Sequence, residues 1–417
     1  MYLYYKGVHP VNAGTNDVVV TGLGATTPLG GDVASTWSAM LAGQSGISRI
    51  TEEWAADFPV RIAGRLKVEP TEVLDRVQAR RMDRCEQIAL VAAREAWADA
   101  GHPDVDPERL AVVIGTGTGG ALTLLGQDDV LESSGVRRVS PHTVPMLMAN
   151  GPAAWVSIDL GARAGAHTPV SACASGAEAI AMGMDLIRLG RADVVVAGGT
   201  EACVHPLPLA GFAQAKAHSR RNDDPQRASR PFDVDRDGFV IGEGSTVVVL
   251  ERAEFAAARA ARAHATLAGA GVTSDAYHIT AAHADGQIRA IRQALTAARL
   301  SPLDIEHVHA HATSTPQGDL VEAESITEAI GTHPAVTATK SMTGHLFGAA
   351  GAIGALAAIL AVRDGVIPAT QNLDALDPRV KLDIVAGEPR RGGLKAALTN
   401  SFGFGGHNAS LVFTPAP

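Results

Sequence analysis

Cys173 is the residue of this 417-residue chain whose surroundings best fit nucleophilic chemistry. The run from Thr168 to Gly176 passes from a short predicted strand directly into a predicted helix, which places Cys173 at a helix N-terminus. Unpaired N–H groups and the helix dipole stabilise negative charge there, so we expect the thiol to ionise readily. The small neighbours Ala172 and Ala174 leave space for a substrate. A lone cysteine in such a place is more often a buried apolar residue than a nucleophile, so its role depends on partners elsewhere in the chain.

Three later runs supply those partners: HAHATSTPQGD (309–319), KSMTGH (340–345) and NSFGFGGHN (400–408). Together with the run around Cys173, they resemble, in content and in order, the motifs of the type II β-ketoacyl-[acyl-carrier-protein] synthases, which have the thiolase fold. The resemblance begins at VVVTGLG (18–24) and continues through RPFD (230–233) and RDGF (236–239) to the terminal strand. It therefore covers nearly the whole chain.

The resemblance implies an α/β, thiolase-like fold of two similar halves in a layered α-β-α-β-α architecture. It also implies a 3-oxoacyl-[acyl-carrier-protein] synthase of fatty acid biosynthesis, an acyltransferase that uses malonyl carrier protein to extend an acyl chain by two carbons. In this decarboxylative Claisen condensation, Cys173 would accept the acyl group, and His311 and His345 would promote decarboxylation. The pairing is chemically reasonable, because loss of carbon dioxide leaves an enolate whose oxyanion two neutral imidazoles can hold.

Further residues acquire roles from the same resemblance. Lys340 and Glu322 would form an electrostatic pair that fixes the histidines, with Asp319 as a third member, because a buried ammonium group needs a carboxylate partner. The backbone N–H groups of Cys173 and Phe404 would form an oxyanion hole. The ring of Phe404 would act as a gate between the acyl pocket and the malonyl site, and its alternative role is that of a packed core aromatic.

Contacts to the substrate and to the partner protein are implied in the same way. Thr313 and Thr315 match hydroxyls that hold the pantetheine arm of the carrier protein, and Phe402 and Thr118 match substrate-binding positions. Candidate docking cations for an acidic carrier protein are Arg137, Arg138, Lys216, Arg220 and Arg221. We also expect a homodimer, because active sites of this family are completed near the subunit interface.

Three residues depart from the family pattern. His309 stands where an asparagine is usual, and Gly354 stands where a glutamate is expected. Both missing residues belong to a monovalent-cation site in related enzymes, so we expect that site to be lost or rebuilt here. Thr118 replaces a bulkier aliphatic residue that narrows the acyl pocket, which leaves the preferred chain length open.

Because of these departures, we consider alternative functions for the chain. One alternative is a specialised or inhibitor-tolerant ketosynthase of polyketide or antibiotic metabolism. Another is a non-catalytic partner subunit that sets product length in a heterodimer, although the retention of Cys173 and both histidines argues against it. A degradative thiolase is disfavoured, because it needs a second reactive cysteine near the C-terminus, where this chain has Ser401 to Phe404.

Alternating strands and helices must position these residues. Short β-branched runs in the first half predict strands at 18–20, 112–114, 194–196 and 246–249, and a second series starts near 254–262 and continues at 265–270, 308–310, 335–339, 396–399 and 410–413. Helices are predicted near 81–100 and 174–189, each followed by a glycine. The continuous apolar character of the strands indicates burial on both faces. We expect a loose tail, 1–16, and two related halves, 17–255 with the cysteine and 256–417 with the histidines.

The overall composition excludes several function classes. A formal net charge of −9 argues against general nucleic-acid binding. The three cysteines, at 85, 173 and 203, are too scattered for a disulfide framework, which indicates a reducing, cytoplasmic compartment. The N-terminus lacks a signal-peptide pattern, and the apolar run 346–362 contains glycines at helical spacing. That run predicts a buried helix and no membrane span.

We predict no cofactor and no metal. The run 233–238 resembles the start of a calcium loop, but position twelve of that loop would be Gly244. The glycine-rich run 115–120 lacks an assignable acidic contact to a ribose, which argues against a nucleotide. His307, His309 and His311 alternate, so a single strand would place all three on one face, and zinc is an alternative there. The family resemblance instead assigns His311 to catalysis without a transition metal.

Overall fold

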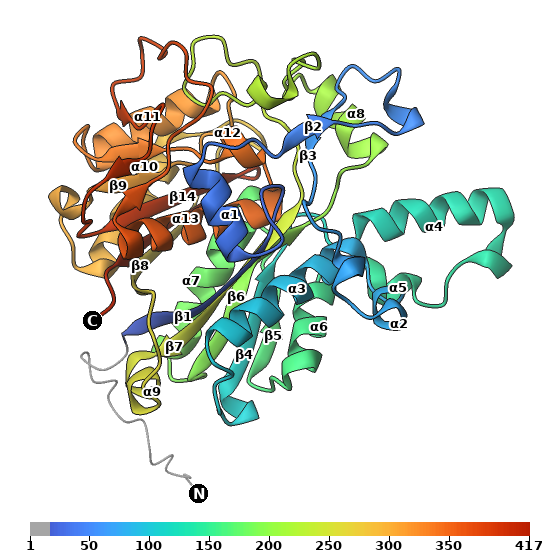
Figure 1. Ribbon diagram of the computed structural model, residues 1–417, viewed down its shortest axis with the longest axis horizontal. Helices are drawn as coiled ribbons and strands as arrows, with labels where there is room; N and C mark the ends of the chain where they lie inside the picture. Colours follow the sequence, from blue (N-terminus) through green and yellow to red (C-terminus); the bar gives the residue numbers. More distant parts are fainter. Residues whose placement is uncertain (1–16) are drawn as a thin grey trace, which may run out of the picture.

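The computed structural model describes residues 17–417, so the predicted tail 1–16 lies outside the described residues. In this part of the chain, strands from both ends of the sequence join one mixed sheet of 11 strands, ordered β12-β10-β9-β14-β15-β8-β1-β7-β6-β4-β5 (Figure 1). These strands are β1 (Val18–Thr26), β4 (Leu110–Gly115), β5 (Gly165–His167), β6 (Val194–Glu201), β7 (Gly244–Arg252), β8 (Ala265–Ser274), β9 (His307–His309), β10 (Ala335–Thr337), β12 (Asp383–Ile384), β14 (Ala397–Gly403) and β15 (His407–Thr414). Two small pairs complete the strands: β2 (Ile47–Arg49) with β3 (Ile62–Gly64), and β11 (Val366–Ile367) with β13 (Arg390–Arg391).

The helices are α1 (Val33–Leu41), α2 (Arg76–Ala79), α3 (Arg84–Asp99), α4 (Ala121–Ser134), α5 (Thr143–Leu147), α6 (Gly151–Leu160), α7 (Ser175–Arg188), α8 (Pro206–Gln214), α9 (Ala253–Ala258), α10 (Ala284–Ala298), α11 (Gly318–Ala329), α12 (Lys340–Thr343) and α13 (Ala350–Asp364). The predicted strands are confirmed except in 254–262, which contains the helix α9, and the two predicted helices are confirmed, with small shifts at the ends of the elements. Asp83 caps α3 through a capping box with Glu86, and Gly101, with φ of 74°, follows its end.

The sheet has two parts, and three layers of helices cover them. One layer lies between the two parts, and one lies on the outer face of each. In β4, Val113 packs against α7 and α13, whereas Val112 faces α3 and α6. In β14, Ala397 belongs to the same central core as α7 and α13, and Leu398 faces α10 and α11. Because successive side chains point to opposite faces, this alternation shows strands covered on both sides. The result is the predicted α-β-α-β-α layering, with α7 and α13 in the middle.

The middle layer is held together by small residues. A Cβ at Gly351 of α13 would lie only 2.6 Å from the backbone nitrogen of Ala177 in α7, so the two helices approach closely. The segment Phe347–Asp364 is the one helix among the described residues that is long and apolar enough to cross a membrane, but 89% of it is buried inside the protein. The prediction of a buried helix for this run is confirmed.

An arm formed by α4 and α5 projects from the body of the protein (Figure 1). No residue of α4 is buried, although the helix carries Leu124 and Leu131. Val136 and Val144, in the segment that returns to the body, are exposed as well. The strand β5, at the nearby edge of the sheet, pairs only with β4 among the described strands. The arm and this sheet edge together leave apolar surface and backbone groups uncovered.

Candidate active site

Cys173 lies in a tight turn at the start of α7, where a short 3-10 helix, Ala172–Ala174, precedes Ser175. Ala172 has a left-handed backbone conformation, with φ of 50°, which costs a non-glycine residue roughly 1–2 kcal/mol. The Ser175 hydroxyl stabilises the turn, because it accepts a hydrogen bond from the backbone N–H of Ser171 at 2.9 Å and donates to the carbonyl of Ala172 at 2.7 Å. The turn places Cys173 on the wall of a cavity of about 710 Å³.

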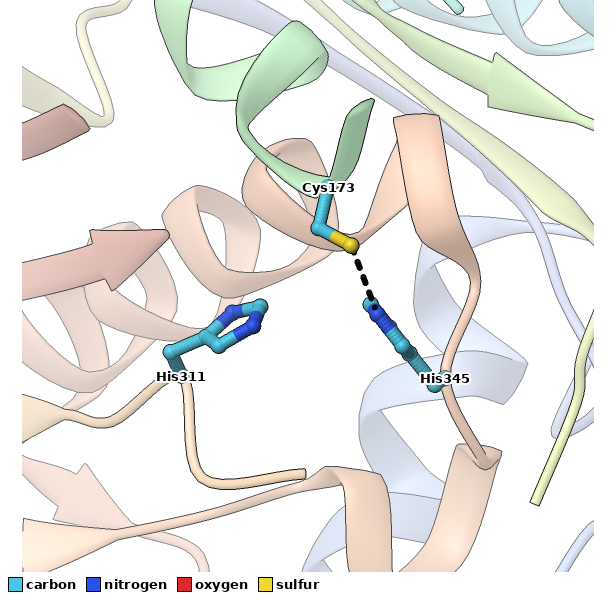
Figure 2. A group of neighbouring side chains, drawn as sticks. All are labelled: Cys173, His311 and His345. Carbon is cyan, nitrogen blue, oxygen red and sulfur yellow. Dashed lines mark hydrogen bonds between the residues drawn. The ribbon is translucent and has the colours of Figure 1, made fainter. Parts of the chain in front are cut away.

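Two histidines from the second half of the chain converge on this sulfur (Figure 2). Nε2 of His345 lies 3.0 Å from Sγ of Cys173, and the rings of His311 and His345 are 5.5 Å apart at 84°. His311 follows the end of β9, and His345 follows α12 after Gly344, whose φ of 70° turns the chain. The Nδ1 atoms of both histidines are buried and have no partner among the described residues. Both histidines line the same cavity as Cys173.

Burial decides the charge state of these three groups. It raises the pKa of Cys173 to about 12, although the charge of Lys340 and the N–H of Phe404 oppose the shift. It also holds the pKa values of His311 and His345 well below their usual range, and Lys340 acts in the same direction. The prediction of a readily ionised thiol is therefore wrong for the free enzyme, because desolvation outweighs the helix dipole. The resting pair is a neutral thiol beside a neutral imidazole that can accept its proton.

Lys340 and Glu322 hold the peptide groups of His311 from two sides. Nζ of Lys340 donates to the carbonyl oxygen of His311. Glu322 accepts the N–H of His311 at 2.7 Å and that of Ala312 at 2.6 Å, and Asn400 donates to the same carboxylate at 3.2 Å. Burial lowers the pKa of Lys340 to about 8 and raises that of Glu322 to about 7, while each charge stabilises the other. The two residues interact electrostatically, and both form hydrogen bonds with backbone groups of His311.

Asp319, in the first turn of α11, orders the loop before that helix. It accepts the N–H of Ser314 at 3.1 Å and lies 3.5 Å from Nε of Arg236. Burial raises the pKa of Asp319 to about 6. The ordered loop carries the hydroxyls of Thr313 and Thr315, which lie 3.0 Å apart on the cavity wall. These hydroxyls are therefore available to a substrate that enters the cavity.

The glycine-rich end of β14 brings Phe404 to the sulfur. Its N–H is a hydrogen-bond partner of the Cys173 thiol. A Cβ at Gly403 would lie 3.1 Å from the backbone nitrogen of Cys173, so only a small residue permits this approach. The ring of Phe404 is 44% exposed on the cavity wall and is not a packed core aromatic. Phe402, in contrast, is buried with its ring 6.0 Å from that of His311.

The candidate docking cations lie in two separate places. Lys216 lines the cavity, and Arg220 and Arg221 follow it in the same segment. Arg221 is partly occupied, because it donates to a backbone carbonyl at 2.8 Å. Arg137 and Arg138 are exposed beyond the far end of α4, on the projecting arm (Figure 1). Within one chain, the structure therefore does not gather the five into a single patch.

The alternating histidines do not form a zinc site. The strand β9 ends at His309, so His311 is not on a continuous strand face with His307. Within residues 17–417, the one group of three histidine, cysteine or carboxylate ligand atoms close enough for a metal ion is Cys173, His311 and His345, within 4.8 Å of one another. A metal ion bound there would occupy the sulfur itself.

His309 and Gly354 fit each other in the core. Nε2 of His309 lies 2.8 Å from Oγ1 of Thr339, and its Nδ1 lies 3.4 Å from Oγ1 of Thr399. A Cβ at Gly354 would lie 2.9 Å from that Nδ1 and 2.7 Å from the Thr399 hydroxyl. The imidazole thus fills the space beside the glycine. Burial keeps the pKa of His309 well below its usual range, so the ring is neutral.

Sequence reasoning missed several residues that shape the cavity. Glu201, at the end of β6, is fully buried on the cavity wall and accepts a hydrogen bond from the Thr118 hydroxyl at 2.6 Å. An acidic residue at the end of an apolar strand is the feature of the sequence that could have drawn attention to it. Ser401 donates to the carbonyl of Cys173 at 2.7 Å. Aromatic rings packed against one another beside His345 are Phe212, His218, Phe239 and Phe347.

The chain belongs to the beta-ketoacyl synthase family. Residues 15–256 match the family described as "Beta-ketoacyl synthase, N-terminal domain", and residues 264–374 match "Beta-ketoacyl synthase, C-terminal domain". The chain is therefore a condensing acyltransferase, which confirms the predicted family, the thiolase-like fold and the β-ketoacyl synthase activity.

Known relatives agree with this assignment over nearly the full length. The 3-oxoacyl-[acyl-carrier-protein] synthase 2 of Mycobacterium tuberculosis (strain ATCC 25618 / H37Rv) is 48% identical, with 95% of this chain and 96% of the relative covered. Among solved structures, the ishigamide ketosynthase/chain length factor has a TM-score of 0.91 at 33% identity, covering 97% of this chain and 100% of that one. A type II PKS ketosynthase bound to its acyl-carrier protein and a hexaketide has a TM-score of 0.88 at 31% identity, with the same coverage.

Proposed function

We propose that Cys173, His311 and His345 carry out a ping-pong condensation between an acyl thioester and a malonyl thioester. The convergence of one thiol and two neutral imidazoles in one cavity carries the proposal. In the first step, Cys173 attacks the acyl carbonyl while His345 accepts the thiol proton, and the carrier thiol leaves with a proton. The backbone N–H groups of Cys173 and Phe404 would stabilise the oxyanion of that step.

The second step needs a different kind of stabilisation. When the malonyl thioester loses carbon dioxide, charge develops on its carbonyl oxygen, and His311 and His345 can donate hydrogen bonds to it. The enolate carbon then attacks the acyl group on Cys173, and the carbon–sulfur bond breaks to release the Cys173 thiolate, which takes up a proton to restore the thiol. The product is a β-ketoacyl thioester two carbons longer. Lys340 and Glu322 support this step by fixing the backbone of His311.

An acyl carrier protein is the proposed donor of both substrates. A solved relative has such a carrier protein bound, and the M. tuberculosis relative is named for one. Thr313 and Thr315 offer hydroxyls to a pantetheine arm on the cavity wall, and Lys216 is exposed beside the cavity.

Fatty acid biosynthesis in the cytoplasm is the pathway and compartment that the relatives named 3-oxoacyl-[acyl-carrier-protein] synthase favour. The division into halves at residue 255 is also a proposal, supported by the two matched ranges.

A specialised ketosynthase of polyketide metabolism is the second candidate. Two of the similar solved structures are ketosynthases that bear polyketide names or a chain length factor. Of the residues that depart from the family pattern, Thr118 lines the cavity, and His309, which packs against Gly354 in the core, is two residues from His311. The retained thiol and histidines disfavour a non-catalytic subunit.

We also propose a homodimer formed through the projecting arm and the edge strand β5. The exposed apolar side chains of the arm and the unpaired edge of β5 support it, because such surfaces are normally covered by another chain. Light scattering should give about twice the chain mass, and Leu124→Asp with Leu131→Asp should shift it toward the monomer. A mass of one chain for the unaltered protein would exclude this proposal.

A chain-length series tests the reaction and the pathway together. Acyl carrier proteins with straight chains of increasing length are assayed with malonyl carrier protein, and the products and the acylated enzyme are measured by intact mass. We expect acyl label on Cys173 and products extended by two carbons. Turnover of ordinary saturated chains supports fatty acid biosynthesis, whereas turnover restricted to polyketide-like or unsaturated chains supports the second candidate. Absence of acyl label on Cys173 would overturn the mechanism.

A further inference from the structure

Glu201 lies on the wall of the catalytic cavity and receives five hydrogen bonds. Its Oε1 accepts from the hydroxyls of Thr116 at 3.1 Å and Thr118 at 2.6 Å and from the N–H of Thr118 at 3.2 Å. Its Oε2 accepts from the N–H of Gly117 at 2.8 Å and of Gly348 at 3.0 Å. Three of these donors are backbone N–H groups, which cannot accept a proton in return, so the arrangement favours the carboxylate form although burial raises the pKa of Glu201.

The carboxylate joins three segments that are distant in the sequence: the loop 116–118 after β4, the end of β6, and the short 3-10 helix Phe347–Ala349. The packing around it is tight. A Cβ at Gly117 would lie 2.6 Å from Oε2, and one at Gly348 would lie 2.9 Å from the same atom. The backbone reaches the carboxylate only because both residues are glycines.

Glu201 and the three segments that it joins form a junction, and this junction supports the cavity wall beside His345. Phe347, directly before Gly348, has a left-handed backbone with φ of 42°, which is unfavourable for a residue with a side chain. Its ring lies 4.7 Å from that of His345 and stacks on Phe212 at 5.3 Å. The hydrogen bond from Gly348 to Glu201 fixes the peptide group next to this strained residue. Glu201 thereby acts on the histidine through Phe347.

The same junction reaches the thiol by two routes. The carbonyl oxygen of Thr116 lies 3.2 Å from the Ser175 hydroxyl, which shares its one proton between Thr116 and Ala172 and organises the turn at Cys173. The negative charge of Glu201 also raises the pKa of Cys173, in opposition to Lys340. His311 and His345 are neutral, and the buried Cys203 has a pKa well above its usual value. Glu322 lines the same cavity but is paired with Lys340. Glu201 and Lys340 therefore act on the thiol with opposite charges.

We propose that Glu201 is a positioning residue of the condensation reaction. Its carboxylate clamps the 116–118 loop to Gly348, which holds Phe347 against His345, and its negative charge lies on the same cavity wall as Cys173, opposite in sign to that of Lys340. This inference rests on the proposed role of Cys173 as the nucleophile.

Glu201→Gln tests both parts of the proposal. The amide keeps the shape, removes the charge and turns an NH₂ group toward N–H donors, which breaks the clamp on one side. We expect the rate of Cys173 alkylation by iodoacetamide, measured from pH 7 to 9 and located by peptide mapping, to rise roughly threefold or more. We expect kcat for condensation to fall about tenfold, because the wall beside His345 loosens. An unchanged or slower alkylation rate would overturn the electrostatic part.

Two matched variants separate charge from structure. Thr116→Val removes one hydrogen bond to Oε1 and keeps the charge, so alkylation should stay within about twofold of the unaltered protein. Glu201→Asp keeps the charge but is too short to reach Gly348, so alkylation should stay the same while condensation falls. These two variants also decide the matter if the glutamine variant does not fold. Full condensation by Glu201→Asp would exclude the clamp, and faster alkylation in Thr116→Val would exclude the charge effect. Failure to acylate Cys173 in the unaltered protein would instead overturn the proposed nucleophile.

Discussion

The two sides of the catalytic cavity are positioned by different means. On the thiol side, a left-handed Ala172 and the Ser175 hydroxyl shape the turn that presents Cys173 at the start of α7. On the histidine side, the buried charges of Lys340 and Glu322 grip the backbone of His311. The first arrangement depends on backbone conformation and neutral hydrogen bonds, and the second depends on ionised groups in a dry environment.

This difference suggests a division of labour. Acyl transfer needs one atom, the sulfur, to be presented at a carbonyl, and a rigid turn is sufficient for that. Decarboxylation needs two hydrogen-bond donors at the place where an oxyanion develops, and small displacements of such donors are costly. Charged contacts are stronger than neutral ones in a low-dielectric interior, so they suit the more demanding side. Variants on one side test this division, because each should affect one half-reaction and spare the other.

The largest effect is expected at Cys173. Cys173→Ala should abolish both acyl-enzyme formation and condensation, because Cys173 is the cavity thiol with a histidine within hydrogen-bond distance. Cys85→Ala and Cys203→Ala should retain both activities, since neither thiol has a histidine partner among the described residues. Intact-mass analysis after incubation with acyl carrier protein measures the label. Label on the Cys173→Ala protein would contradict the assignment.

Variants of the two histidines should separate the two half-reactions. His311→Ala and His345→Ala should each slow release of carbon dioxide from malonyl carrier protein by about 10²-fold or more. Acyl transfer to Cys173 should persist in both, but the His345 variant should transfer slowly at neutral pH and faster as the pH rises. The sign follows from the raised pKa of Cys173, because the thiolate fraction grows with pH when no imidazole takes the proton. Unchanged carbon dioxide release in both variants would refute the shared role.

Glu322→Gln tests whether decarboxylation depends on the hydrogen bonds that the Glu322 carboxylate accepts from the backbone of His311 and Ala312. The amide can accept from only one of the two backbone N–H groups, so decarboxylation should fall about tenfold while acyl transfer is nearly unaffected. Glu324→Gln, on the same helix but exposed to solvent, is the matched control and should leave both steps unchanged. Equal losses in acyl transfer and decarboxylation would mean that the two sides are not positioned independently.

The smallest effect concerns the site beside His309. Replacing His309 by Asn and Gly354 by Glu together should increase monovalent-cation binding, seen as an ion-selective gain in melting temperature at fixed ionic strength. Gly354→Glu alone should destabilise the protein, because a side chain there would collide with the His309 ring. His309→Asn alone should have a smaller effect than the double variant on ion binding. Equal melting temperatures in sodium, potassium and a bulky organic cation would count against a lost cation site.

The fold and the central triad were accessible from the sequence because each depends on local runs. The strands appear as continuous β-branched segments, and the cysteine and histidine motifs are contiguous and specific. The raised pKa of Cys173 was not accessible, because it depends on desolvation by segments far away in the chain. Glu201 was missed for the same reason, since its partners Thr116 and Gly348 lie 85 and 147 residues from it. The exposure of Phe404 likewise depends on where the turn between β14 and β15 lies on the cavity wall.

The fit between His309 and Gly354 makes substitutions at the two positions interdependent. A Cβ at 354 would lie 2.9 Å from Nδ1 of His309 and 2.7 Å from the hydroxyl of Thr399, so a side chain at 354 requires the imidazole to move. A smaller residue at 309 would instead leave a cavity beside the glycine, at a cost in stability. The free-energy changes of substitutions at 309 and 354 are therefore expected to be non-additive.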